Sequence, residues 1–127
     1  FDENIFLYLE NDDLCKRLIN LNENIYIAPK SKINHLGASG TSKKYSYQVE
    51  ISRNWHWMWS KFYFKRKHYG YLNALISGFP KFLSSILKFL FYTVFRKQNK
   101  REIYFNRASG YLNALLGNKS TYRPKLD

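Results

Sequence analysis

A long helix is predicted by the stretch YSYQVEISRNWHWMWSKFYFKRKH, which covers residues 45–68. Neither proline nor glycine interrupts it, and Trp55, Trp59 and Phe62 recur at the spacing that places side chains on one face of a helix. A largely polar stripe runs beside this aromatic face and consists of His56, Ser60, Tyr63 and Lys67. Two interpretations of the stripe stay open: it faces a polar cleft, or it is the solvated side of an amphipathic helix.

A second, more apolar helix is predicted over about residues 71–95, with Pro80 expected to kink or restart it. Lys81 and Lys88 lie seven residues apart and therefore on one face. Their charges argue against a transmembrane span, which needs about 20 apolar residues with few charges. The helix suits a membrane interface or the protein's own core, and the basic residues that follow it favour an anionic membrane: Arg96, Lys97, Lys100 and Arg101.

The hexapeptide GYLNAL occurs twice, at residues 70–75 and 110–115. Two copies are too few for a solenoid of stacked repeats. Each copy places a helical pattern directly after a glycine, so each is interpreted as the start of a helix.

Charge is distributed unevenly along the 127 residues, whose formal net charge is +12. Residues 1–40 hold six acids and four bases, whereas residues 41–127 hold three acids and seventeen bases. The length allows one domain at most, and an aromatic content of 19% argues against disorder. The single cysteine, Cys15, excludes an internal disulfide and indicates a reducing compartment. An acidic head on a basic, aromatic body suggests one chemical role and one role at an anionic surface.

The segment before residue 45 is predicted to contain one helix and short extended pieces. Leu14, Leu18 and Leu21 have helical spacing, and Asn11 or Asp12 can serve as the N-cap. Residues 25–28 predict a short strand that Pro29 stops, and residues 31–36 predict another extended piece before a glycine- and serine-rich loop. The chain begins without an initiator methionine, from which we expect a C-terminal piece of a longer protein.

The cluster Glu10-Asn11-Asp12-Asp13 is the candidate catalytic site. Carboxylates at a helix start beside an apolar run suit general-base catalysis, because the apolar wall raises a carboxyl pKa while helix N–H groups hold the anion. Glu10, Asp13 and Arg17 fall on about one side of the helix. Acidic helix starts also occur as simple caps. His35, before the flexible loop, could ligate a divalent metal or bind phosphate, or be an ordinary surface histidine.

Residues 1–70 resemble family 2 glycosyltransferases, in particular the bacterial rhamnosyltransferase-like branch. The family's acidic motif, roughly F-D-E-x-F-F-x-Y-x-E-D-x-D-L-C-x-R, is similar to FDENIFLYLENDDLCKR at residues 1–17. Further blocks follow in the same order: IYIAP at 25–29, INHLG at 33–37, WHWMWSKFYF at 55–64 and KHYG at 67–70. One departure is Asn11, which replaces the second acid of the motif and cannot accept a proton.

The resemblance implies an α/β fold. Residues 1–44 would be the C-terminal part of a GT-A catalytic domain, and residues 45–127 a basic, helical, membrane-associated region. It further implies inverting transfer of a sugar from a nucleotide-sugar. The Mg²⁺ or Mn²⁺ ion would be bound mainly by residues that precede Phe1. Glu10 would be the catalytic base with Asp13 next, and His35 would approach the metal or diphosphate. The residues expected to bind substrate are Arg17, His56, Ser60 and Lys67.

The expected acceptor is a saccharide or a lipid-linked component of the cell envelope. The expected location is the cytoplasm, peripherally on the inner face of the cell membrane, and this chain alone is not expected to turn over. Two alternatives stay open. A basic, aromatic module could bind nucleic acid, although no nucleic-acid-binding motif is visible and we expect no such partner. The chain could also be a membrane-peripheral scaffold without chemistry.

Overall fold

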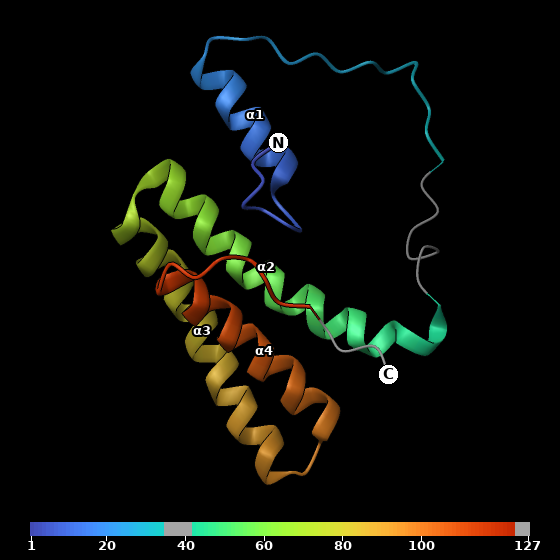
Figure 1. Ribbon diagram of the computed structural model, residues 1–127, viewed down its shortest axis with the longest axis vertical. Coiled ribbons are helices and arrows are strands. Elements are labelled where there is room, and N and C mark those ends of the chain that lie inside the picture. The colour runs from blue at the N-terminus through green and yellow to red at the C-terminus, as the bar shows by residue number, and fades with distance from the viewer. Residues whose placement is uncertain (35–41, 124–127) are drawn as a thin grey trace.

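Helices are the only regular secondary structure in residues 1–34 and 42–123, which are the residues that the computed structural model describes (Figure 1). Its elements are α1 (Glu10–Asn20), the short 3₁₀ helix η1 (Lys43–Tyr45), α2 (Ser46–Tyr69), α3 (Tyr71–Val94) and α4 (Gln98–Leu115). Helices α2, α3 and α4 form an antiparallel bundle, and α1 lies to one side of it.

The predicted α/β fold class, with a GT-A domain part in residues 1–44, is wrong for this structure, since no strand occurs in the described ranges. Residues 25–28, the expected strand, are exposed and pair with no other described segment. The same holds for residues 31–34, the described part of the expected extended piece at 31–36. Ile27 and Ile33 are 89% and 87% exposed. A strand needs a neighbouring backbone to satisfy its N–H and C=O groups, and no described segment offers one.

The predicted helices are confirmed, with changes at their ends. The helix predicted over residues 45–68 is α2 (Ser46–Tyr69), and the one predicted over about residues 71–95 is α3 (Tyr71–Val94), which continues through Pro80. Helix α1 begins at Glu10, earlier than expected, so neither Asn11 nor Asp12 is its N-cap. The preceding residue, Leu9, has a left-handed backbone with φ of 67° and makes no side-chain cap.

The core lies where α2 meets α3 and α4. Buried Trp55, Met58, Trp59 and Phe62 of α2 pack with Ala74, Tyr111 and Ala114 of the other two helices. Each large side chain that leaves water here contributes about 2 kcal/mol. Gly110 permits the close approach of α4, because a Cβ at this position would overlap the carbonyl oxygen of Trp55.

The two copies of GYLNAL have different roles. The first follows the corner at Gly70, where φ is 86° and a single residue separates α2 from α3. The second lies at the C-terminal end of α4, so its interpretation as a helix start is wrong. Gly110 is used for close packing against α2, whereas Gly70 is used for a turn that favours glycine.

The C-terminal segment packs along α2 (Figure 1). The Trp59 indole Nε1 donates to the carbonyl oxygen of Asn118 over 2.9 Å, and the ring of Tyr122 stacks on Trp55 at 5.4 Å between centroids. This segment therefore covers part of α2 that α3 and α4 leave open.

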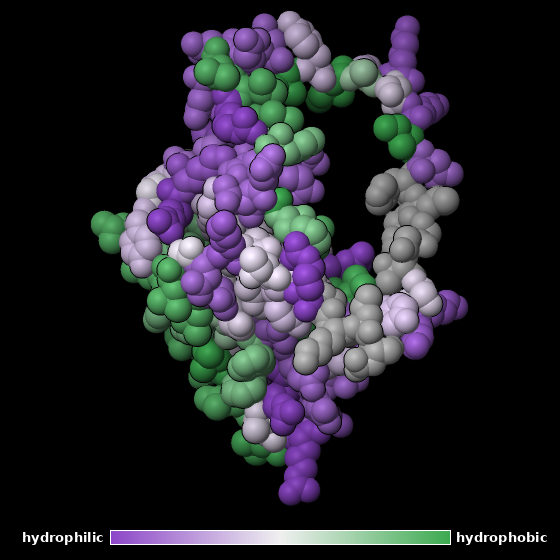
Figure 2. Space-filling model, in the orientation of Figure 1, coloured by the Kyte–Doolittle hydropathy of each residue, from purple (hydrophilic) through white to green (hydrophobic). Residues whose placement is uncertain are grey.

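Helix α3 has an exposed apolar stripe. It is long and apolar enough to cross a membrane by length and composition, and only 11% of its most apolar window is buried. Figure 2 shows hydrophobic residues gathered on the side of the molecule where α3 lies. The stripe, called here the α3 stripe, consists of Leu72, Ile76, Phe79, Leu83, Leu87, Leu90 and Val94.

Candidate functional site

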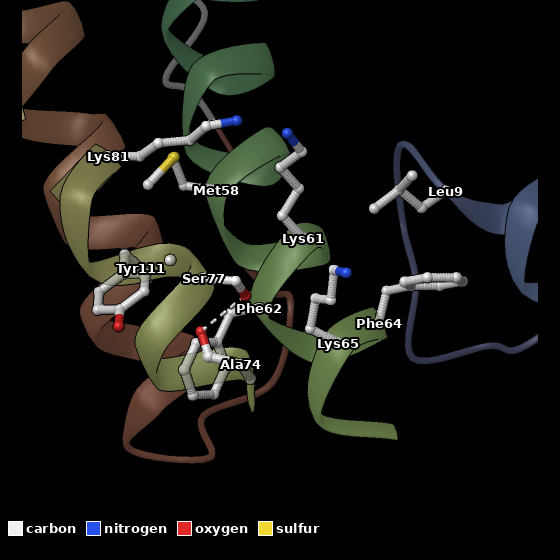
Figure 3. Close-up of a pocket in the computed structure, with 11 residues that line it drawn as sticks. Leu9, Met58, Lys61, Phe62, Phe64, Lys65, Ala74, Ser77, Lys81 and Tyr111 are labelled. Atoms are coloured by element: carbon white, nitrogen blue, oxygen red, sulfur yellow. Dashed lines mark hydrogen bonds between the residues drawn. The ribbon is translucent and has the colours of Figure 1, made fainter. Parts of the chain in front are cut away.

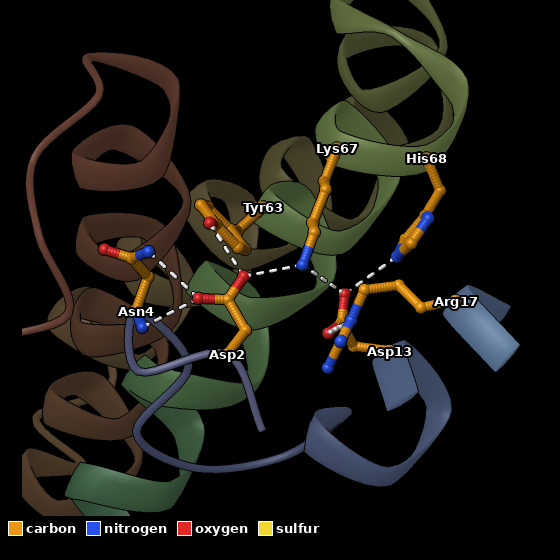
Figure 4. A network of polar contacts seen from close by, with 7 residues as sticks. All are labelled: Asp2, Asn4, Asp13, Arg17, Tyr63, Lys67 and His68. Carbon is orange, nitrogen blue, oxygen red and sulfur yellow. Dashed lines mark hydrogen bonds and ion pairs between the residues drawn. The ribbon is translucent and has the colours of Figure 1, made fainter. Parts of the chain in front are cut away.

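A network of charged side chains fastens the acidic motif to α2 (Figure 4). The Asp13 side chain has no exposed surface. Its Oδ2 accepts a hydrogen bond from Arg17 Nε over 2.9 Å. Its Oδ1 lies 2.7 Å from Lys67 Nζ and 2.8 Å from His68 Nε2, both on the last turn of α2. Asp13 thus joins α1 to a residue 55 positions along the chain.

Asp2 holds the N-terminal segment to the C-terminal part of α2, where Asp13 also binds. Its Oδ2 lies 2.7 Å from Lys67 Nζ and accepts a hydrogen bond from the Tyr63 hydroxyl over 3.0 Å. Its Oδ1 accepts hydrogen bonds from the backbone and side chain of Asn4, both 2.9 Å long. Lys67 therefore bridges two carboxylates of the acidic motif, those of Asp2 and Asp13.

These contacts change the acidity of both carboxyls. Burial alone would raise the pKa of Asp13, but hydrogen bonds from Lys67, His68 and Arg17 outweigh burial and hold the pKa below its ordinary value. Asp2 has a lowered pKa for the same reason, with burial opposing and Lys67 the main hydrogen-bond donor. A carboxylate stabilised in this way is a weak base. Both are suited to holding the segment in place.

Glu10 differs from Asp13 although it lies only three residues away. Its Oε2 is buried and has no hydrogen-bond partner among the described residues. A buried polar atom without a partner costs about 1–3 kcal/mol, so such atoms usually await a ligand, water or further chain. Of the two predicted catalytic residues, Glu10 is the one with a carboxylate oxygen that accepts no hydrogen bond from the described residues.

The turn that leads into Glu10 is strained and supported from α2. Tyr8 and Leu9 both have left-handed backbones, with φ of 69° and 67°. Such a conformation costs about 1–2 kcal/mol for each non-glycine residue and is often found at functional sites. The Ser60 hydroxyl donates to the carbonyl oxygen of Leu7 over 2.7 Å, and the Tyr8 ring meets the edge of Trp57. Ser60 thus positions the turn before the motif.

The polar stripe of α2 faces other parts of the chain. His56 and Ser60 are fully buried. His56 Nδ1 lies 2.9 Å from the Ser120 hydroxyl, and its Nε2 lies 3.0 Å from the carbonyl oxygen of Tyr122. Burial lowers the pKa of His56. The stripe therefore lies under the N-terminal and C-terminal segments, an arrangement that neither sequence interpretation included.

The predicted substrate-binding residues thus divide into two groups. Arg17 and Lys67 lie together in the network around Asp13, whereas His56 and Ser60 hold the terminal segments. Sequence reasoning missed Asp2 and His68 as parts of the network. No local signal could have found them, because their partners lie 55 or more positions away.

Residues 1–34 and 42–123 do not by themselves form a site for a divalent metal. No group of three His, Cys, Asp or Glu side chains there could hold one. Asp2 and Asp13 already have their charges balanced by Lys67. His35, the predicted metal ligand, lies outside the described residues. We therefore route no chemical step through a metal.

Comparison with family models, curated proteins and solved structures gave no match for this chain. The likeness to family 2 glycosyltransferases accordingly rests on the motif blocks of residues 1–70. Any further argument for function must come from the chain's own geometry.

Proposed function

We propose that this chain is the C-terminal, acceptor-side portion of an inverting glycosyltransferase that works at a membrane surface. It would help to move a sugar from a nucleotide-sugar to a saccharide or lipid-linked cell-envelope acceptor. The observation that carries the proposal is the buried, unpartnered Oε2 of Glu10, next to carboxylates that are fully paired. The nucleotide-binding part would precede Phe1 in a longer protein.

In this proposal Glu10 is the catalytic base. Its carboxylate accepts the proton of the acceptor hydroxyl while that oxygen forms a bond to the anomeric carbon. The bond from that carbon to the nucleotide diphosphate breaks, and its electron pair leaves with the diphosphate. Attack from the opposite side inverts the anomeric centre. Asp13 is a positioning residue, because its lowered pKa and its hydrogen bonds with Lys67, His68 and Arg17 make it a poor proton acceptor.

A matched pair of substitutions in the intact protein tests this role. Glu10→Gln should lower kcat by about 10²- to 10⁴-fold, the usual contribution of a general base. Asp12→Asn removes an exposed carboxylate from the same turn and should leave kcat close to that of the parent. The assay is sugar transfer from a panel of nucleotide-sugars. Equal activity in the two variants would remove Glu10 from the mechanism.

Attachment to the inner face of the cell membrane is supported by the α3 stripe. The stripe would enter the acyl region of a bilayer, whereas Lys81 and Lys88 lie on the opposite face of α3, where Lys88 Nζ is 5.2 Å from the centre of the Tyr104 ring of α4. The high positive charge of the chain suits an anionic leaflet.

Flotation with vesicles of phosphatidylcholine and phosphatidylglycerol tests this attachment. The variant Leu83→Glu/Leu87→Glu should lose most vesicle binding. The control Ile27→Glu/Ile33→Glu adds the same charge at apolar residues that are even more exposed but lie outside α3, and it should still float. Absence of flotation by the parent protein, together with salt-sensitive binding to oligonucleotides, would favour the nucleic-acid module instead.

A further inference from the structure

A cavity of about 240 Å³ lies between α2 and α3, apart from the network around Asp13. Its floor is apolar and includes Met58, Phe62, Ala74 and Tyr111. Leu9, the residue before the candidate base, forms part of one wall. Figure 3 shows Lys61 of α2 and Lys81 of α3 extending toward one another across it, with Lys65 one turn further along α2.

Three ammonium groups therefore meet at a cavity whose described lining contains no carboxylate. Like charges that share a site repel one another, and more strongly where apolar atoms exclude water. Burial of Lys61, with the neighbouring charges of Lys81, Arg107 and Lys65, lowers its pKa from 10.5 to about 8. The cluster thus lacks the anion that would balance it.

Two of the lysines are held in place by aromatic rings. Lys61 Nζ lies 4.5 Å from the centre of the Trp57 ring, and Lys65 Nζ lies 4.7 Å from that of Tyr69. Contacts of a cation with a ring face restrict the side chain and favour its charged form. The ammonium groups are therefore arranged before any ligand arrives.

We propose that this cavity binds the phosphate head group of an anionic membrane lipid, with phosphate oxygens between Lys61 and Lys81. Lysine is a common phosphate ligand, and several ammonium groups suit a group with more than one negative charge. The apolar floor distinguishes a lipid from free phosphate, because it offers a surface to the first carbons of a chain. Helix α3 contributes a wall of the cavity through Ala74, Ser77 and Lys81, on the face opposite the α3 stripe, so the lipid would lie on the side of the helix that faces α2.

The proposal uses the membrane attachment proposed above as the source of the lipid, but it does not depend on Glu10 or on sugar transfer. Its test is therefore a binding measurement in solution. The probe is a short-chain phosphatidic acid kept below its aggregation limit, titrated into the intact protein by calorimetry. Inorganic phosphate and a short-chain uncharged diglyceride form the comparison arms.

We expect phosphatidic acid to bind at least about tenfold more tightly than either comparison ligand, since only it supplies both charge and chain. Lys61→Gln/Lys81→Gln should weaken this binding by about tenfold or more, the effect of losing a charge-assisted hydrogen bond. Lys30→Gln/Lys32→Gln removes the same charge from exposed lysines outside the cavity and should have little effect. Leu83→Glu/Leu87→Glu should still bind the soluble probe, which separates this site from membrane insertion.

Two results would overturn the proposal. The first is equal binding of phosphatidic acid to the cavity variant and to the control variant, because the lysines would then not form the site. The second is binding of inorganic phosphate as tight as that of phosphatidic acid, because the apolar floor would then have no role. Circular dichroism verifies that the cavity variant is folded, and Lys81→Gln alone, at an exposed residue, provides a milder second variant.

Discussion

Asp13 determines how α1 attaches to the rest of the molecule. Its buried carboxylate meets Arg17, Lys67 and His68, so the loss of its charge removes the acidic partner of Arg17 and leaves Lys67 with Asp2 alone. The pair with Arg17 follows from the spacing of four residues on a helix and was predictable. The pairs with Lys67 and His68 were not, because sequence spacing says nothing about which distant turn a helix meets.

Substitution of Asp13 should therefore destabilise the fold. Asp13→Asn should lower the free energy of unfolding by about 2 kcal/mol, because it replaces a fully buried carboxylate that engages Arg17, Lys67 and His68 with a neutral amide. Urea unfolding followed by circular dichroism measures the change. Asp12→Asn, at an exposed neighbour, should alter stability by less than about 0.5 kcal/mol. Equal effects of the two would show that the network around Asp13 does not stabilise the fold.

Stability should also fall at low pH through the same carboxyl. The folded-state pKa of Asp13 is lowered, so its contribution is present above the ordinary value of 3.8 and is lost as pH falls toward the lower folded value. Unfolding free energies measured from about pH 5 to about pH 2 should show this loss. Asp2 contributes with the same sign, since its pKa is lowered as well. Asp13→Asn should reduce the slope, and an unchanged slope would contradict the assignment.

At the scale of the element, α4 depends on close contact with α2. A side chain at residue 110 would meet backbone atoms of Trp55, which cannot rotate away. Gly110→Ala should therefore destabilise by about 1–3 kcal/mol, although alanine favours helix more than glycine by about 1 kcal/mol. Leu112→Ala, at a partly exposed residue of the same helix, should cost less. Thermal unfolding compares them, and a more stable Gly110→Ala would show that α4 can shift.

Helices and strands differed in how well the sequence predicted them. The aromatic spacing of α2 is a local property, and the helix followed it. Residues 25–28 have strand-forming side chains, but a strand also needs a partner, which no described segment supplies. The polar stripe of α2 is correct as a pattern, yet what covers His56 and Ser60 comes from segments more than 50 residues away. Periodicity identifies a face and does not say what lies against it.

At the scale of the whole molecule, the helical bundle and residues 1–20, called here the head, are held by different interactions. The bundle of α2, α3 and α4 is held by a buried apolar core, whereas residues 1–20 are held largely by Asp2, Asp13 and Ser60. Ile5 is the one apolar side chain of residues 1–20 that is buried, and segments with few buried apolar contacts open at a lower free energy than a packed core. The head should therefore open without unfolding of the bundle.

Hydrogen exchange should show this separation. Lys67→Gln removes the ammonium group that bridges Asp2 and Asp13, so amides of α1 should exchange faster while those of α4 keep their protection. Lys43→Gln, at an exposed lysine of η1, is the matched control and should leave both unchanged. Faster exchange of α4 in Lys67→Gln would indicate one cooperative unit in place of two.

The corner at Gly70 couples the orientations of α2 and α3. One residue is too short to act as a flexible tether, so α2 cannot swivel independently of α3. Any surface that fixes the direction of α3 also fixes the tilt of α2. It thereby fixes the orientation of the acidic motif, which is bound to the last turn of α2, next to this corner. Adding residues at this corner would uncouple these directions even if every helix kept its own structure.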